Sequence, residues 1–203
     1  EALSHQLTGL NEAEIMARLG YPDQHPEGLF LPETYHFQRG MTDVAFLRRA
    51  YRMMAEQLDQ LWQERPDDTL LQTPYDALIL ASIIEKETAV GAERPEISGV
   101  FTRRLQKGMR LQTDPTVIYG MGEDYQGNIR RQDLRTDTPY NTYTRAGLPP
   151  TPICMPGVAS IRAALHPKEG DSLYFVAKGD GNHHFSASLK EHNRAVRQYQ
   201  LKR

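Results

Sequence analysis

Apolar residues recur at helical spacing in five segments of the chain. The longest segment covers residues 43–64, where apolar positions follow the three-and-four-residue rhythm of a helix with one buried side. These positions are Phe46, Leu47, Ala50, Met53, Met54, Leu58 and Leu61. Shorter patterns of the same kind cover residues 12–19, 73–88, 92–107 and 188–201. The pattern therefore predicts five helices that pack through their apolar sides.

Residues that favour helix ends stand at the boundaries of these segments. Asn11 and Thr73 are suited to the N-cap position, and Pro74 is suited to the first helical position. Gly20 and Gly108 follow the last apolar residues of their segments and are typical of helix ends. The predicted boundaries therefore have a chemical basis besides periodicity.

The remaining sequence predicts loops and one hairpin. Residues 26–40 and 109–170 are punctuated by Gly and Pro, so we expect only short elements there. Residues 173–177 are typical of a strand, residues 179–182 of a turn, and residues 183–185 of a returning strand. Together these elements predict an α+β fold, a helix-rich domain with a small antiparallel sheet.

Composition narrows the class of protein. The chain has 203 residues, enough for one well-packed domain or for one domain with a small appendage. Apolar residues make up 39% and charged residues 25%, which is ordinary for a globular protein. The net charge of −2 gives no general attraction to nucleic acid, so no nucleic-acid partner is expected. An uncharged polymer such as a glycan remains compatible with this charge.

Two further features concern cysteine and the membrane. Cys154 is the only cysteine, so no internal disulfide can form, and no base stands beside it to make it reactive. The longest apolar run, residues 77–84, is far shorter than the roughly 20 residues that cross a bilayer. Because the chain begins at Glu1 rather than Met, it looks like an excised piece, and a signal or membrane anchor could lie upstream of it.

Glu87 is the most promising chemical group in the sequence. It follows a segment that is apolar on nearly every side, and it continues the helix face of Leu80, Ile83 and Ile84. A carboxyl group held against apolar side chains loses hydration, and its pKa rises toward the value that a general acid needs. The alternative is a solvated helix end at which the glutamates pair with Lys86 or Arg94.

No metal or cofactor site is expected. His183, His184 and His192 lie near Glu191, but adjacent histidines in a strand point to opposite faces, and tetrahedral ligand spacing is missing. A hydrogen-bonded histidine on one face and a solvated one on the other is the preferred interpretation. The sequence also has no Gly-rich phosphate loop and no Ser-His-Asp pattern.

Several ordered blocks of sequence together resemble one known family. They begin near residue 26, end near residue 198, and follow one another with matching spacing. The blocks are EG at 27–28, PETY at 32–35, ASIIEKETA at 81–89, RLQKGMRLQTDPTVIYG at 104–120, YNTY at 140–143, GLPP at 147–150, LYFV at 173–176 and HN at 192–193. They resemble the catalytic domain of the endolytic murein transglycosylases, the MltG or YceG-like family.

The resemblance implies a division of the chain and a location. Residues 26–203 would form a YceG-like catalytic domain, and residues 1–25 would be a short remnant of an upstream region. That family carries a transmembrane helix and a small LysM-like region upstream, which implies a bacterial inner-membrane protein whose catalytic domain faces the periplasm. The implied partners are glycan strands of peptidoglycan, with cell-wall synthases as candidate protein partners.

The resemblance also implies a reaction. The second glutamate of the Glu-Lys-Glu triplet, here Glu87, would be the catalytic residue that cleaves the bond between N-acetylmuramic acid and N-acetylglucosamine. It would act first as acid and then as base, leaving a 1,6-anhydro end and so terminating the growing strand. Side chains that can hydrogen-bond sugars or pack on them are the candidate substrate contacts: Gln112, Asp114, Tyr140, Asn141, Thr142 and Tyr143.

Other interpretations stay open at this point. For each candidate contact, the alternative is polar packing within a loop, and Asn141 or Thr142 could instead hold Glu87 or the sugar in place. Asp114 could be the second carboxylate of a hydrolytic muramidase, although an Asp before Pro is also typical of a turn. The chain could also be a catalytically inert peptidoglycan-binding scaffold or a hydrolase of another polysaccharide.

Overall fold

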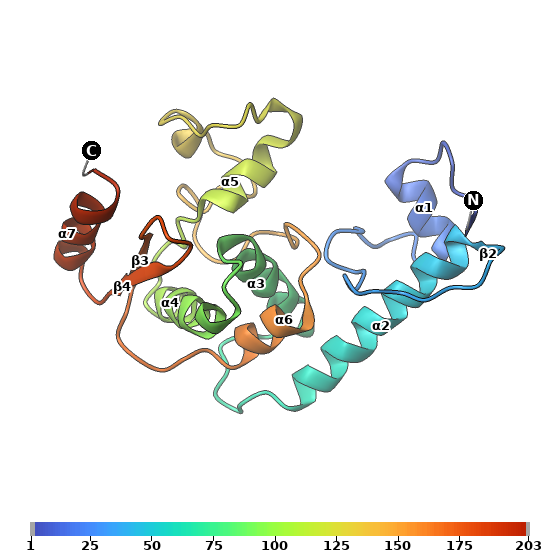
Figure 1. The fold of residues 1–203 in the computed structure, drawn as a ribbon, viewed down its shortest axis with the longest axis horizontal. Coiled ribbons are helices and arrows are strands. Elements are labelled where there is room, and N and C mark those ends of the chain that lie inside the picture. The colour runs from blue at the N-terminus through green and yellow to red at the C-terminus, as the bar shows by residue number, and fades with distance from the viewer. Residues whose placement is uncertain (1–2, 202–203) are drawn as a thin grey trace.

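The computed structural model describes residues 3–201, and its centre is the buried helix α3, Pro74–Glu87. Residues 77–84 of this helix are buried without exception, which is why its sequence is apolar on every side. Figure 1 shows α3 surrounded by four other helices. These are α2 (Asp43–Gln63), α4 (Arg94–Gln106), α5 (Asp114–Met121) and α6 (Val158–Leu165).

Local chemistry fixes where α3 begins. The hydroxyl of Thr73 accepts a hydrogen bond from the backbone N–H of Asp76, and the Asp76 carboxylate accepts one from the backbone N–H of Thr73. This reciprocal capping box, with Pro74 at the first helical position, satisfies N–H groups that a helix start leaves unpaired.

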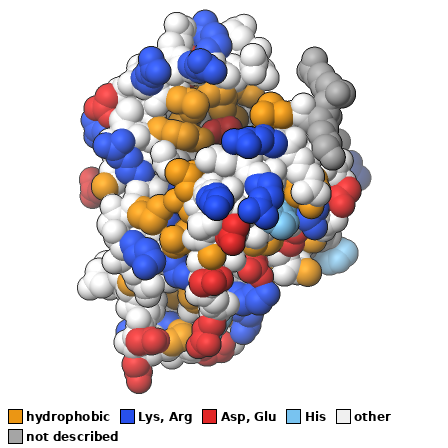
Figure 2. Space-filling model, turned by 90° about the vertical axis from the view of Figure 1, so that its left-hand side faces the viewer, with side chains coloured by type: hydrophobic (Ala, Val, Ile, Leu, Met, Phe, Trp, Pro, Cys, Tyr) orange, Lys and Arg blue, Asp and Glu red, His pale blue; other side chains and the backbone are white. Residues whose placement is uncertain are grey.

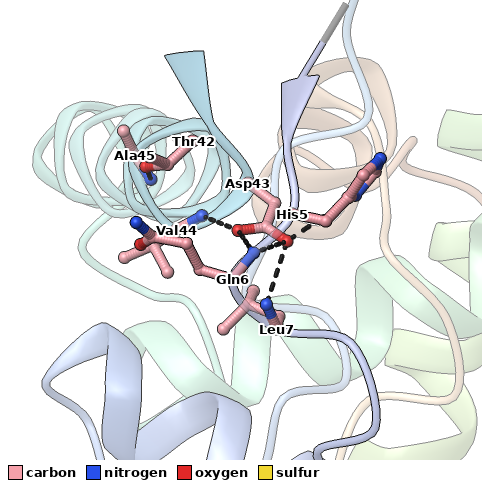
Figure 3. A network of polar contacts seen from close by, with 7 residues as sticks. All are labelled: His5, Gln6, Leu7, Thr42, Asp43, Val44 and Ala45. Carbon is pink, nitrogen blue, oxygen red and sulfur yellow. Dashed lines mark hydrogen bonds and ion pairs between the residues drawn. The ribbon is translucent and has the colours of Figure 1, made fainter. Parts of the chain in front are cut away.

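The N-terminal segment packs on the first half of α2. Strand β1 (Leu3–Ser4) pairs in parallel with β2 (Met41–Thr42), and helix α1 (Glu12–Leu19) lies beside α2. The Asp43 carboxylate accepts hydrogen bonds from the backbone N–H groups of Gln6, Leu7 and Val44 at 2.8 to 3.1 Å (Figure 3). These contacts fasten the chain before α1 to the start of α2.

A second apolar cluster lies where this segment meets α2. Its buried members are Leu7, Met16, Leu19, Phe30, Val44 and Ala50, so residues on both sides of position 25 contribute to it. The division of the chain into residues 1–25 and residues 26–203 stays a prediction.

The C-terminal part forms a hairpin followed by a helix. Strands β3 (Tyr174–Ala177) and β4 (His183–Ser186) pair antiparallel, with Phe175 opposite Phe185, and α7 (Leu189–Tyr199) packs on them. On the side of the molecule that carries α7, Lys and Arg side chains stand around a hollow with apolar walls (Figure 2).

The α+β fold predicted from the sequence is confirmed. The five predicted helices and the hairpin all form; the bounds of α1 agree with the prediction, and those of the other elements differ from it by at most two residues. Residues 109–170 contain α5 and α6, each of eight residues, and otherwise loops and short 3-10 turns. The remaining short 3-10 turn, Gly91–Glu93, leads into α4. No helix within residues 3–201 has the length and apolarity needed to cross a membrane.

Candidate active site

Glu87 is the last residue of α3, and its carboxyl group has a strongly raised pKa. Burial among protein atoms is the largest cause and brings the pKa from 4.5 to about 7, although the side chain keeps partial contact with solvent. The hydrogen bond from Thr113 and the nearby His183 ring lower it, whereas the negative charge of Asp114 raises it. At neutral pH the group is therefore divided between acid and carboxylate, as proton transfer in both directions requires.

The Glu87 side chain lines a cleft with a volume of about 460 Å³. One wall comes from the segment that enters α5, and the other comes from the β3–β4 hairpin and α7. Besides Glu87, the lining residues are Arg104, Leu111, Gln112, Thr113, Asp114, Tyr143, Tyr174, Phe175, Val176, Ala177, His183, Leu189, His192, Val196 and Gln200. The cleft is thus built from segments far apart in the sequence and carries both charged and apolar groups.

Thr113 holds the Glu87 carboxyl group, and two further threonines hold Thr113. The Thr113 hydroxyl donates to Oε1 of Glu87, while the Thr113 backbone N–H donates to the Thr142 hydroxyl oxygen at 3.1 Å. The Thr116 hydroxyl donates to the Thr113 carbonyl at 2.8 Å and lies 2.9 Å from the Thr142 hydroxyl. Because all three threonines are buried, Thr113 has little freedom to turn away from Glu87.

The backbone bends sharply just before Thr113. Gln112 has a φ of +52°, the only positive φ of a residue other than glycine within residues 3–201. Its N–H donates to the Thr142 carbonyl at 3.2 Å. This contact supports the unusual conformation, which leaves the Gln112 side chain exposed at the cleft.

Asp114 and Tyr143 form a second polar pair at the cleft. The Tyr143 hydroxyl donates to Oδ1 of Asp114 at 2.5 Å, and burial together with this carboxylate raises the pKa of the Tyr143 phenol. Asp114 is the first residue of α5 rather than part of an isolated turn. A carboxylate therefore lies in the same cleft as Glu87, with one of its oxygens occupied by a phenol.

Arg104 ties the two walls of the cleft together. Its guanidinium donates to the carbonyls of Leu173 at 2.7 Å and Leu111 at 2.8 Å, and it lies over the Tyr174 ring. Arg104 is only 8% exposed, so the lost hydration is compensated by these carbonyls and by the aromatic face.

The structure brings four of the residues predicted from the sequence into one cleft: Glu87, Gln112, Asp114 and Tyr143. Tyr140, Asn141 and Thr142 lie outside it. The Tyr140 hydroxyl is 2.8 Å from that of Thr151, and the Asn141 amide donates to three backbone carbonyls of residues 133–136. Asn141 and Thr142 are 1% and 3% exposed, which suits a supporting position behind the cleft better than contact with a ligand.

The neighbouring glutamate has a different position. The Glu85 carboxylate accepts from the backbone N–H of Gly157 at 3.0 Å, from the Ser160 hydroxyl at 2.7 Å and from Arg94 at 3.1 Å. Glu85 thereby holds the start of α6. Its pairing with Arg94 agrees with the alternative interpretation of the helix end, in which the glutamates pair with Lys86 or Arg94. The two glutamates thus face different sides of α3, as helical spacing requires.

Several cleft residues were not identified from the sequence. Thr113 lies inside the Gln112–Asp114 motif, and its position beside two candidates was the available signal. Arg104, Tyr174, His183 and His192 reach the cleft from other elements, so only tertiary packing reveals them. Within residues 3–201 no group of three or more His, Cys, Asp or Glu side chains is arranged to hold a metal ion.

Cys154 lies outside the cleft. Its thiol donates to the Ser82 carbonyl at 3.3 Å, and burial raises its pKa to about 12. A thiol in this state is a poor nucleophile at neutral pH, which fits the interpretation of an unreactive side chain.

The domain is a helix-rich α+β fold in which one carboxyl group of raised pKa faces a polar and aromatic cleft. These are the features expected of an enzyme that uses a general acid. The chain belongs to the YceG-like family, whose family model matches residues 2–198. It is 39% identical over 177 residues to an endolytic murein transglycosylase of Bacillus subtilis (strain 168), covering 87% of this chain and 49% of that protein.

Two further relatives agree with this assignment. An endolytic murein transglycosylase of Streptococcus pneumoniae (serotype 2, strain D39) is 30% identical over 178 residues, covering 85% of this chain and 32% of that protein. The crystal structure of a YceG-like protein from Listeria monocytogenes matches with a TM-score of 0.72 and 35% identity, covering 90% of this chain and 62% of that one. The chain therefore spans about half of the Bacillus subtilis transglycosylase and about a third of the Streptococcus pneumoniae transglycosylase.

Proposed function

We propose that this domain cleaves glycan strands of peptidoglycan as an endolytic lytic transglycosylase, with Glu87 as its single acid and base. The observation that carries the proposal is the Glu87 carboxyl group with a pKa of about 7 in an open cleft. The names of the relatives supply the substrate class, since two of them are endolytic murein transglycosylases.

In the first step Glu87 acts as the acid. Its protonated carboxyl group donates a proton to the oxygen between N-acetylmuramic acid and N-acetylglucosamine, and the bond from that oxygen to muramyl C1 breaks. Because Thr113 donates to Oε1, Oε2 is the oxygen left to carry this proton. Positive charge then develops on the muramyl ring, and the carboxylate just formed stabilises it.

In the second step the same group acts as the base. The Glu87 carboxylate takes the proton of the muramyl C6 hydroxyl, and that oxygen forms a bond to C1 to give the 1,6-anhydro ring. Water is not consumed, and Glu87 is protonated again. The nucleophile belongs to the sugar itself, so proximity replaces the second carboxylate that most glycosidases use.

Two cleft residues are suited to direct contact with the strand. The exposed amide of Gln112 can exchange hydrogen bonds with sugar hydroxyl or acetamido groups, and the Tyr143 ring can pack on a sugar face. Asn141 and Thr142 act behind the cleft, through the loop that supports Thr113.

Cleavage of this kind would end the growth of nascent strands. We further propose that the domain works at the outer face of the bacterial inner membrane, held there by an anchor upstream of residue 1, with cell-wall synthases as partners. The support for this location is the nature of the substrate in the relatives' names, because murein lies outside that membrane.

The test is an analysis of reaction products. The protein is incubated with uncrosslinked peptidoglycan strands, beside Glu87→Gln and a matched control, Glu56→Gln, which changes an exposed glutamate of α2. Mass spectrometry is expected to find 1,6-anhydro-muramyl ends, which are lighter by one water than reducing ends, with the wild type and the control. Glu87→Gln should produce no such ends.

Other outcomes would redirect the proposal. Reducing ends would identify a muramidase, with Asp114 as the candidate second carboxylate. Comparable turnover of chitin oligomers would contradict peptidoglycan specificity. Strand binding that is equal in wild type and Glu87→Gln, with no cleavage by either, would favour an inert scaffold.

A further inference from the structure

His183, which lines the cleft, forms a partly buried pair with Glu93, and the proposed reaction does not use this pair. His183 is the first residue of β4, and Glu93 ends the 3-10 turn before α4. One Glu93 oxygen accepts from the His183 backbone N–H at 2.8 Å, and the other lies 2.8 Å from ring Nδ1. The side chains are only 12% and 14% exposed, so this two-point contact holds the ring firmly.

The contact determines which ring nitrogen carries hydrogen. Burial tends to raise the pKa of Glu93, but the hydrogen bonds that its carboxylate accepts from the His183 backbone and ring outweigh burial and leave the pKa lowered. Glu93 is therefore an ionised carboxylate that can only accept, so Nδ1 must be the donor. In the neutral ring this leaves Nε2 with a free lone pair, ready to accept a hydrogen bond.

The imidazole stands between Glu93 and the cleft lining. His183 lines the cleft whereas Glu93 does not, and the Nδ1 edge of the ring faces Glu93. Within residues 3–201 the ring forms a hydrogen bond only through Nδ1. The Phe175 ring stands at 90° to the imidazole, with 5.4 Å between centroids, and limits its rotation.

We propose that His183 is a substrate-binding residue whose Nε2 accepts a hydrogen bond from an O–H or N–H group of the glycan beside Glu87. Glu93 is then a positioning residue that fixes the imidazole in the accepting tautomer. The identity of the ligand as a glycan rests on the proposed function. The acceptor itself rests on the Glu93 contact and on the place of His183 in the cleft.

Substitutions at these two positions separate binding from folding. His183→Ala removes the acceptor. Glu93→Gln keeps the shape and can still accept from the His183 backbone N–H, but its amide N–H₂ now donates to Nδ1, so the ring hydrogen moves to Nε2 and the acceptor is lost. His184→Ala is the matched control, because the next residue of β4 points to the other face, toward Tyr199.

The experiment measures the affinity for fluorescent uncrosslinked peptidoglycan strands in a Glu87→Gln background, which prevents turnover. Loss of one hydrogen bond is expected to weaken binding about five- to tenfold for both His183→Ala and Glu93→Gln. His184→Ala should leave the affinity unchanged, and thermal unfolding of each variant shows whether it is folded.

Each outcome bears on the proposal. Affinities of His183→Ala and Glu93→Gln equal to that of His184→Ala would overturn it, and an effect of His183→Ala alone would overturn the role of Glu93. Strands that the Glu87→Gln background does not bind at all would instead contradict the proposed substrate, and this proposal with it. If 6-O-acetylated strands abolish the His183 effect, the donor is the C6 hydroxyl; if they preserve it, the donor is another hydroxyl or an acetamido N–H.

Discussion

Replacing Glu87 by Gln is expected to stabilise the folded protein at neutral and alkaline pH. The pKa of Glu87 is raised from 4.5 to about 7 by folding, so between these values the folded state holds a proton that the unfolded state has released. The free energy of unfolding therefore falls as pH rises from about 4.5 to 7, and above pH 7 the full loss of stability caused by the Glu87 carboxylate is present. A rise of this size corresponds to about 3 kcal/mol at roughly 1.4 kcal/mol per pH unit. Water in the cleft makes this an upper limit.

Urea unfolding at pH 4 and pH 8 measures the effect. Wild type and Glu87→Gln should be nearly equal in free energy of unfolding at pH 4, and the variant should be more stable by up to about 3 kcal/mol at pH 8. Glu56→Gln, which changes an exposed glutamate, should show no such pH-dependent difference. A Glu87→Gln effect that is the same at both pH values would refute the idea that burial raises this pKa.

Three further predictions follow from the same contacts. Thr113→Val removes a donor to the Glu87 carboxylate and should raise the pKa of Glu87 further. The alkaline limb of the kcat/KM profile should then move upward from near pH 7 by about one pH unit, whereas Thr113→Ser should leave it in place. An unmoved limb in Thr113→Val would contradict the role of this hydrogen bond. Glu85→Ala removes the acceptor of Arg94, Gly157 and Ser160 and should lower the free energy of unfolding in urea by about 2 kcal/mol without moving that limb. Cys154 should react with iodoacetamide at pH 7.5 about 100-fold more slowly than a cysteine in a peptide, and rapid alkylation would disprove its burial.

Helical periodicity was sufficient to distinguish Glu87 from Glu85. Residues 77–84 are buried on every side, so the helix geometry alone determines where the two following glutamates point. Glu85 faces α6, and Glu87 faces the cleft. The same regularity explains why the long helices and the hairpin could be predicted from their sequence patterns.

Residue type alone did not separate ligand contacts from structural contacts. Asn141 has an amide suited to sugars, but three backbone carbonyls occupy it, and local periodicity says nothing about such loop contacts. His183 enters the cleft from a hairpin about 90 residues beyond Glu93, with which it pairs. The parallel pairing of β1 with β2 involves two residues in each strand, too few for an alternating pattern.

The central claim is that one carboxyl group breaks the glycosidic bond with the sugar's own hydroxyl as nucleophile. Cleavage of uncrosslinked strands in water enriched in ¹⁸O tests it most directly. With wild-type protein we expect new muramyl ends that contain no ¹⁸O, and loss of these ends with Glu87→Gln. Incorporation of one ¹⁸O atom into each new end would contradict the account, because it would identify water as the nucleophile.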